Sequence, residues 1–195
     1  MTGLVFSPFK KTISTVDLAD VTWEGVRNWP SKHGDAVREV LDGKIKGNIE
    51  EVLDEIVYFL AFATDYAFWC QLEDKPQIRI AVRSTFMAHL RKFAQEHRCQ
   101  PIPSGEWLED SLIWIPNGPQ ESKDSWTNLM KRFDLYGRSL ARRHDRSAGE
   151  RTSHLLAAWC GTSSAVFILF TTPLFLGKWE GVQNVLKSVR IKLGG

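Results

Sequence analysis

Apolar residues recur every three or four positions along much of this chain, the spacing that gathers them on one face of a helix. The clearest run starts after Asn48, and it becomes apolar nearly all round from Tyr58 to Trp69, as in a helix at the centre of a bundle. Asn48 followed by Glu51 is a capping-box-like start. The pattern therefore predicts one unbroken and deeply buried helix over residues 48–70.

A second inner stripe runs through residues 78–97, and its apolar positions are Ile78, Val82, Phe86, Leu90 and Phe93. Asp74 is the expected N-cap, and Pro76 is tolerated in the first turn because no backbone N–H is needed there. His89 falls within this stripe. We therefore expect His89 to be a buried, hydrogen-bonded core residue.

Two more amphipathic patterns follow later in the chain. One begins near Pro119, ends in the charged run at 142–146, and has the inner face Trp126, Leu129, Met130, Phe133 and Leu140. In the other, Lys178, Lys187 and Arg190 face outward, and the inward side is formed by Trp179, Val182, Leu186 and Val189. With shorter stripes near the start, these patterns predict an all-α fold, a single-domain bundle of about five or six helices over residues 1–195, in which residues 1–20 are irregular.

Residues 100–119 break the helical pattern with four prolines. Trp107 and Trp114 lie in this stretch and are expected to pin it to the bundle. Loops of this length are uncommon in compact domains and are often functional. We therefore expect Trp107 and Trp114 to contribute to a binding surface.

The segment 155–177 contains 23 residues without a charge, which is long enough to cross a bilayer as a helix. It is, however, interrupted at 161–164 and at Pro173, and basic residues flank both of its ends, which leaves no positive-inside asymmetry. We therefore expect two buried elements with a second bend at Pro173. A membrane anchor is the alternative.

The composition, 43% hydrophobic and 25% charged, is typical of a soluble globular domain, and the net charge of +2 implies no global attraction to nucleic acid or anionic lipid. Cys70, Cys99 and Cys160 form no C-x-x-C pair, which favours a reducing compartment. The cytoplasm is therefore the expected location, with membrane association as the alternative. No H-x-x-x-H or H-E-x-x-H spacing occurs, so neither a metal site nor a cofactor is predicted.

Several carboxylates need partners or a favourable position. Asp65 lies within the apolar run, so it must reach solvent or pair with Arg79, Arg83 or Arg138. Four others lie in the first turns of the 48–70 helix, where the helix dipole favours negative charge: Glu50, Glu51, Asp54 and Glu55. A structural role is the simplest interpretation of all five.

Arg138 is followed by Ser139 and then, six positions after the arginine, by His144. This spacing is similar to the R-x(4–6)-H motif of HEPN-type helical ribonucleases and toxins. The resemblance implies an RNA-cleaving or RNA-binding protein in which Arg138 holds a phosphate and His144 transfers protons at the 2′-hydroxyl. In the alternative interpretation, the charged run 138–146 is a solvated helix end.

Lys131, Arg138 and Arg142 form a cationic ridge that suits phosphates or an acidic protein surface. Aromatic residues that could stack on bases are missing from this side, so a protein partner is favoured over nucleic acid. We therefore expect a non-enzymatic interaction or accessory protein. The HEPN-like protein and a membrane-attached subunit anchored by 155–177 are the alternatives.

Overall fold

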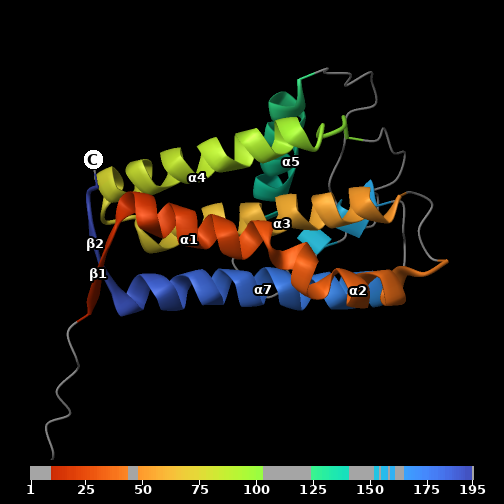
Figure 1. Cartoon of the computed structure of the whole chain (residues 1–195), viewed down its shortest axis with the longest axis horizontal. Coiled ribbons are helices and arrows are strands. Elements are labelled where there is room, and N and C mark those ends of the chain that lie inside the picture. The colour runs from red at the N-terminus through yellow and green to blue at the C-terminus, as the bar shows by residue number, and fades with distance from the viewer. Residues whose placement is uncertain are drawn as a thin grey trace, which may run out of the picture.

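The computed structural model describes residues 10–43, 48–102, 124–140, 152–153, 155–157, 159–160 and 165–194. Its long helices are α1 (Thr15–Arg27), α2 (Trp29–Leu41), α3 (Ile49–Gln71), α4 (Pro76–Glu96), α5 (Ser125–Leu140) and α7 (Ala165–Ser188). Residues 152–153 and 155–157 are also helical, and two short strands complete the described part, β1 (Lys11–Ser14) and β2 (Val189–Lys192). The predicted all-α bundle is confirmed (Figure 1).

Helix α3 is the centre of the bundle and contacts α1, α2, α4, α5 and α7. Figure 1 shows it between α4 on one side and α7 on the other. The stretch Tyr58–Ala63 is buried on all sides, with no residue more than 6% exposed. The side chain of Asn48 caps the helix by accepting the N–H of Glu50 at 3.0 Å. The predicted buried helix is therefore confirmed, with an end one residue later than expected.

Helix α4 buries the predicted stripe, since Val82, Phe86 and Leu90 have no exposed surface. Its N-cap is Lys75, without a side-chain cap, so the prediction of Asp74 as the cap is wrong. The reason is the position of Pro76, because proline is favoured at the first helical residue and sets the cap one residue before itself.

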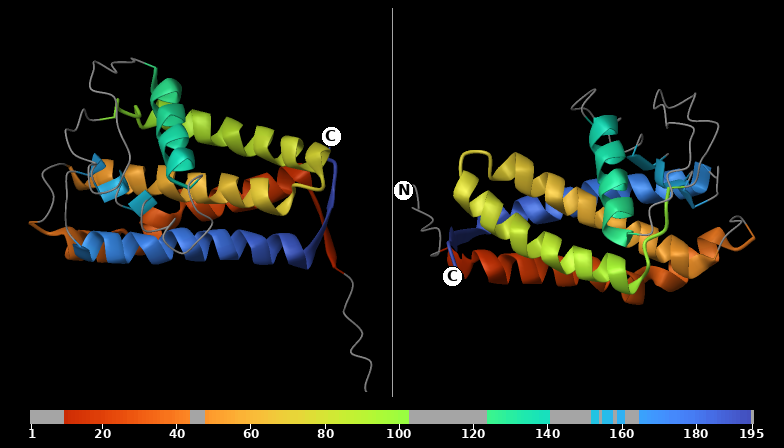
Figure 2. Two further views of the ribbon diagram at one scale, coloured as in Figure 1. Left: turned by 180° about the vertical axis from the view of Figure 1, so that it is seen from behind. Right: turned by 90° about the horizontal axis from the view of Figure 1, so that it is seen from above.

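Helix α5 begins at Ser125, later than the expected start near Pro119. Asp124 accepts the backbone N–H of Thr127 at 3.0 Å, and this bond satisfies one of the free donors of the first turn. The helix lies across α3 and α4 at a steep angle, as both views in Figure 2 show. It buries Leu129 and Leu140 on the predicted inner face.

Helix α7 runs without a break through Pro173, so the second bend expected there is wrong. Because proline has no backbone N–H, Pro173 makes no hydrogen bond to the carbonyl of Leu169, four residues earlier. Leu169 is 73% exposed, so this carbonyl lies on a turn that faces solvent. The hydroxyls of Thr171 and Thr172 donate to the carbonyls of Phe167 and Ile168, both at 2.9 Å. Packing along α3 then holds the helix together.

The helical stretch around 155–157 and α7 are separate elements, as expected, and the residues 161–164 between them lie outside the described part. None of the helices that the structure describes combines the length and apolarity needed to cross a membrane. Lys178, expected to face outward, is instead partly buried, and its amine lies beside Gly25 of α1.

The strands β1 and β2 form a parallel pair, in which Lys11 is opposite Val189 and Ser14 is opposite Lys192. This pair brings the two terminal segments together at one end of the bundle (Figure 1). The expectation that residues 1–20 are irregular is therefore wrong over 11–20, because β1 and the start of α1 lie there. A strand that forms only by pairing with a distant segment leaves no local periodicity to find.

Candidate functional site

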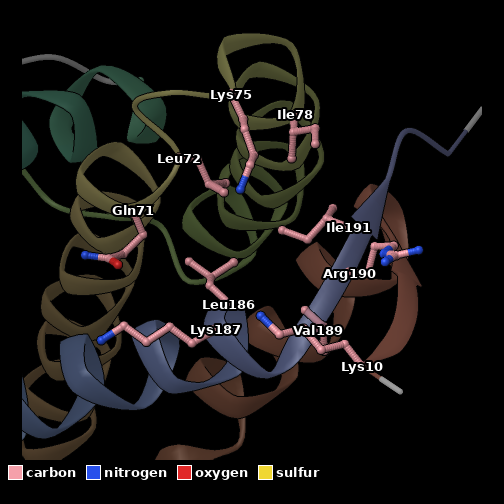
Figure 3. A pocket seen from close by; sticks show the side chains of 10 residues that line it. All are labelled: Lys10, Gln71, Leu72, Lys75, Ile78, Leu186, Lys187, Val189, Arg190 and Ile191. Carbon is pink, nitrogen blue, oxygen red and sulfur yellow. The ribbon is translucent and has the colours of Figure 1, made fainter. Parts of the chain in front are cut away.

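A cavity of about 550 Å³ opens at the end of the bundle where β1 and β2 pair (Figure 3). Its walls come from the end of α3, the start of α4, the end of α7 and the two strand segments. The lining residues are Lys10, Gln71, Leu72, Lys75, Ile78, Leu186, Lys187, Val189, Arg190 and Ile191. The volume is in the range of pockets that hold small molecules.

The chain turns sharply between α3 and α4 and so places both helix ends at this cavity. The backbone N–H of Lys75 donates to the carbonyl of Leu72 at 3.1 Å, which closes the turn. Leu72 is only 2% exposed and forms part of the buried surface below the cavity. Leu186 and Lys187 reach it from the last turn of α7, immediately before β2.

The strand β2 presents its residues alternately to its two faces. Val189 and Ile191 are half-buried, whereas Arg190 is exposed. Figure 3 shows the guanidinium of Arg190 pointing away from the cavity and the amines of Lys10 and Lys75 pointing toward Leu186. The cationic groups aimed at the cavity are therefore mainly lysine amines.

In the part of the chain that the structure describes, the lining residues include the bases Lys10, Lys75, Lys187 and Arg190 and no acidic residue. The nearest carboxylate partner of Lys75 is Asp74, at 3.8 Å. Both of these side chains are more than half exposed, so the pair contributes little and leaves the amine available to a ligand. The described lining therefore carries a net positive charge.

The start of α4 adds to this positive charge. Its N-cap, Lys75, makes no side-chain hydrogen bond, and its first turn contains no acidic residue. The first backbone N–H groups of a helix lack intrahelical partners and carry the positive end of the helix dipole. The same residues that line the cavity, Lys75 and Ile78, lie in this turn.

The residues predicted as a site from the sequence do not line this cavity. On α5, Arg138 is 69% exposed and pairs with Asp134 at 2.6 Å, one turn earlier, and Lys131 lies on the same helix. Arg142, His144, Trp107 and Trp114 lie outside the described residues. The Arg138–His144 hypothesis and the binding role of the 100–119 loop therefore stay predictions.

Two ionic predictions have clear outcomes. Asp65 forms a two-point ion pair with Arg83, at 2.5 and 2.9 Å, as expected. His89 is not buried, because its side chain is 38% exposed and lies at the edge of the α4 stripe, where α1 supplies the partner Asp20 at 2.7 Å. Its ring also stacks on that of Trp23. His89 therefore joins α4 to α1 at a half-exposed position.

The carboxylates at the start of α3 have partners that the sequence did not indicate. Each of three binds a cationic or imidazole side chain from a different part of the fold. The pairs are Glu50 with Arg38 at 2.7 Å, Asp54 with His97 at 2.9 Å, and Glu55 with Arg132 at 2.5 Å. They fix the bundle around α3 and are distant in sequence from the cavity residues.

The Glu55–Arg132 pair lies in a buried polar cluster with Cys99 and Cys160 nearby. Burial opposes the charge of Arg132, but attraction to Glu55 outweighs it and raises the pKa of the guanidinium. Burial also raises the pKa of Cys99 to about 12 and that of Cys160 above its ordinary range. Both thiols are therefore protonated near neutral pH, which argues against nucleophilic chemistry in this cluster.

Within the described ranges, no three histidine, cysteine, aspartate or glutamate side chains are grouped closely enough to hold a metal ion. The basic cavity is therefore the best candidate site. Sequence reasoning missed it because its residues come from stretches that are far apart in the sequence, at 10, 71–78 and 186–191.

Compared with known proteins, this chain matches no protein-family model, no curated protein and no solved structure. Its function must therefore be inferred from the geometry of the chain itself.

Proposed function

We propose that this chain is a non-enzymatic binding protein, and that its basic cavity holds an anionic group of the molecule it binds. One observation carries the proposal: among the described residues, Lys10, Lys75 and Lys187 line the cavity and no acidic residue does. Like charges that lie close together repel each other, and a bound anion would relieve that repulsion. Carboxylates and phosphates are the biological anions that lysine amines bind.

The chemistry of the lining supports binding over catalysis. Acid–base or nucleophilic catalysis ordinarily uses histidine, cysteine, a carboxylate, an activated hydroxyl or a lysine whose pKa is lowered by burial. The described lining residues include none of the first four, the three lysines among them are exposed, and Gln71 is their sole uncharged polar side chain. Amines and an amide can hold and orient an anion, which is the task of an interaction or accessory protein.

The lysines are also well placed to adapt to a ligand. Lys10, Lys75 and Lys187 come from the segment before β1, the start of α4 and the end of α7. Figure 3 shows the amines of Lys10 and Lys75 on opposite sides of Leu186, whereas the Lys187 side chain extends away from Leu186. Lysine has a flexible stem and a compact charge, which suits a group without fixed planar geometry. We therefore expect affinity that falls steeply with added salt.

The test is an NMR titration of the full chain with inorganic phosphate and, separately, acetate at low ionic strength. We expect the backbone amide signals of residues 71–78 and 186–191 to shift together. Lys75→Gln should weaken phosphate binding about fivefold, the effect of losing roughly one kcal/mol of charge attraction.

Lys92→Gln is the matched control, because Lys92 lies on the same helix, is exposed, and faces Glu96 at 3.8 Å instead of the cavity. It should leave the affinity unchanged. Shifts that are absent at millimolar phosphate, or equal weakening by the two substitutions, would contradict the proposal.

A further inference from the structure

We propose that the ligand of this cavity is an amphipathic anion, a single phosphate or carboxylate joined to a short alkyl body. This inference rests on the proposed anion-binding function and adds the class of molecule. Its basis is that the same cavity combines lysine amines with apolar side chains.

Half of the lining is aliphatic. The apolar members are Leu72, Ile78, Leu186, Val189 and Ile191. Leu72 is nearly fully buried, and Ile78, Leu186 and Ile191 are partly exposed while they pack against the core. Inorganic phosphate would leave this surface in contact with water. A ligand with an alkyl body would cover it, and each buried methylene strengthens binding roughly fourfold.

The positions of the charges exclude a separation into a polar mouth and an apolar interior. Figure 3 shows the Lys75 amine beside Leu72 on one side of Leu186, and the Lys10 amine on the other side of Leu186 near Val189. Cationic and aliphatic groups therefore alternate within one cavity. A ligand that satisfies both must carry its charge and its apolar part within a few bonds of each other.

The residue types also separate this ligand from a nucleotide. None of the described lining residues is aromatic, so they offer a base no surface to stack on. The described lining also lacks a carboxylate that could accept hydrogen bonds from ribose hydroxyls. The volume of about 550 Å³ is far more than a lone phosphate needs and suits a small organic molecule. An alkyl phosphate or alkyl carboxylate meets all three conditions.

The test compares affinities measured by calorimetry on the full chain for inorganic phosphate, butyl phosphate and octyl phosphate, each below its critical micelle concentration. We expect affinity to rise with chain length, and octyl phosphate to bind at least a hundredfold more tightly than inorganic phosphate. Octyl glucoside, which has the same tail and no charge, should bind at least tenfold more weakly than octyl phosphate. Octanoate, which joins a carboxylate to an alkyl tail, should show the same gain in affinity from its tail as octyl phosphate does.

Two substitutions separate the two halves of the ligand. Leu186→Gln should remove most of the gain from the tail and leave inorganic phosphate binding unchanged, whereas Lys75→Gln should weaken both. Ile78→Gln tests the gain in affinity from the alkyl tail again, at a second partly exposed position. Circular dichroism checks that this variant and Leu186→Gln are folded.

The outcomes are distinguishable. If phosphate binds and octyl phosphate binds no more tightly, the amphipathic ligand is wrong and the anion site stands. If neither binds, both proposals fail. Binding only to vesicles of phosphatidic acid and phosphatidylcholine, and never to monomeric octyl phosphate, would overturn the inference in favour of a membrane surface.

Discussion

The guanidinium of Arg132 on α5 hydrogen-bonds the carboxylate of Glu55 on α3, although 77 positions separate the two residues. Arg132 is 1% exposed, and its remaining donors reach the carbonyls of Gln100 and Asn128 at 2.7 and 3.3 Å. The ring of Trp159 lies over the same guanidinium. This pair connects α5 and the segment after α4 to the centre of the bundle.

Replacing Arg132 by methionine should lower the free energy of unfolding by about 3–5 kcal/mol, because Glu55 is left buried without its partner. Urea denaturation followed by circular dichroism measures this. Arg138→Met is the matched control on the same helix, since Arg138 is exposed and pairs only with Asp134; it should cost at most about 0.5 kcal/mol. Equal effects of the two substitutions would show that the buried pair has no special role.

Lys178 makes stability depend on pH in the alkaline range. Its amine is partly buried beside Gly25, no carboxylate in the described part of the chain pairs with it, and burial lowers its pKa to about 8. Below pH 8 the amine is charged in the folded and in the unfolded protein. The folded protein is then destabilised, because it holds a charged amine that is partly removed from water. Between pH 8 and about 10.4 the unfolded state binds more protons, so the protein gains stability as pH rises.

Lys178→Met should therefore raise the unfolding free energy by about 1–2 kcal/mol at pH 7, a value reduced for the remaining solvent contact of the amine. The gain should shrink above pH 8 and vanish near pH 10.5. Lys187→Met, at an exposed position of the same helix, should show no such trend. A gain that stays constant from pH 7 to pH 10.5 would rule out desolvation of Lys178 as the cause.

His89→Asp should destabilise the protein by about 1 kcal/mol, because it places a second carboxylate opposite Asp20 at a half-exposed site. Adding Asp20→Asn should recover most of that loss, since the repulsion is then gone. Thermal melts of the single and double variants measure the difference. A double variant no more stable than His89→Asp alone would mean that the loss comes from packing against Trp23.

The cysteines should differ in reactivity. Cys70 is exposed, whereas Cys99 and Cys160 are buried. Partial burial raises the pKa of the Cys70 thiol, so its alkylation should accelerate as pH rises from 7 to 9. Mass spectrometry after brief alkylation should find one modified cysteine in the native protein and three in urea. Rapid native labelling of Cys160 would contradict the described core.

The central helices were predictable because their signals are local. Asn48 starts α3 and an apolar run fills it, and the stripe from Val82 to Phe93 gives α4 its inner face. Their burial needs nothing beyond a repeat of three to four residues. The need of Asp65 for a cation was also predictable, since it lies in an apolar run, and its partner Arg83 is one of the three arginines expected.

The parts that could not be predicted depend on contacts between distant segments. Lys11 and Val189 meet only in the folded chain, and the cavity is assembled from the segments around that meeting point. Pro173 was expected to bend α7 because its local effect was considered without the packing of α7 on α3. Arg132, by contrast, lies three residues after Leu129 on the inner face of α5, so its burial was a signal present in the sequence and missed.

The most direct test of the basic cavity is protection of its amines from chemical modification. The full chain is acetylated briefly with and without saturating inorganic phosphate or octyl phosphate, and each lysine is quantified by mass spectrometry. We predict that ligand slows the acetylation of Lys10, Lys75 and Lys187, and leaves the exposed Lys32 and Lys92 unchanged. Equal rates with and without ligand at the three cavity lysines, or uniform protection of all five, would contradict an anion site at this end of the bundle.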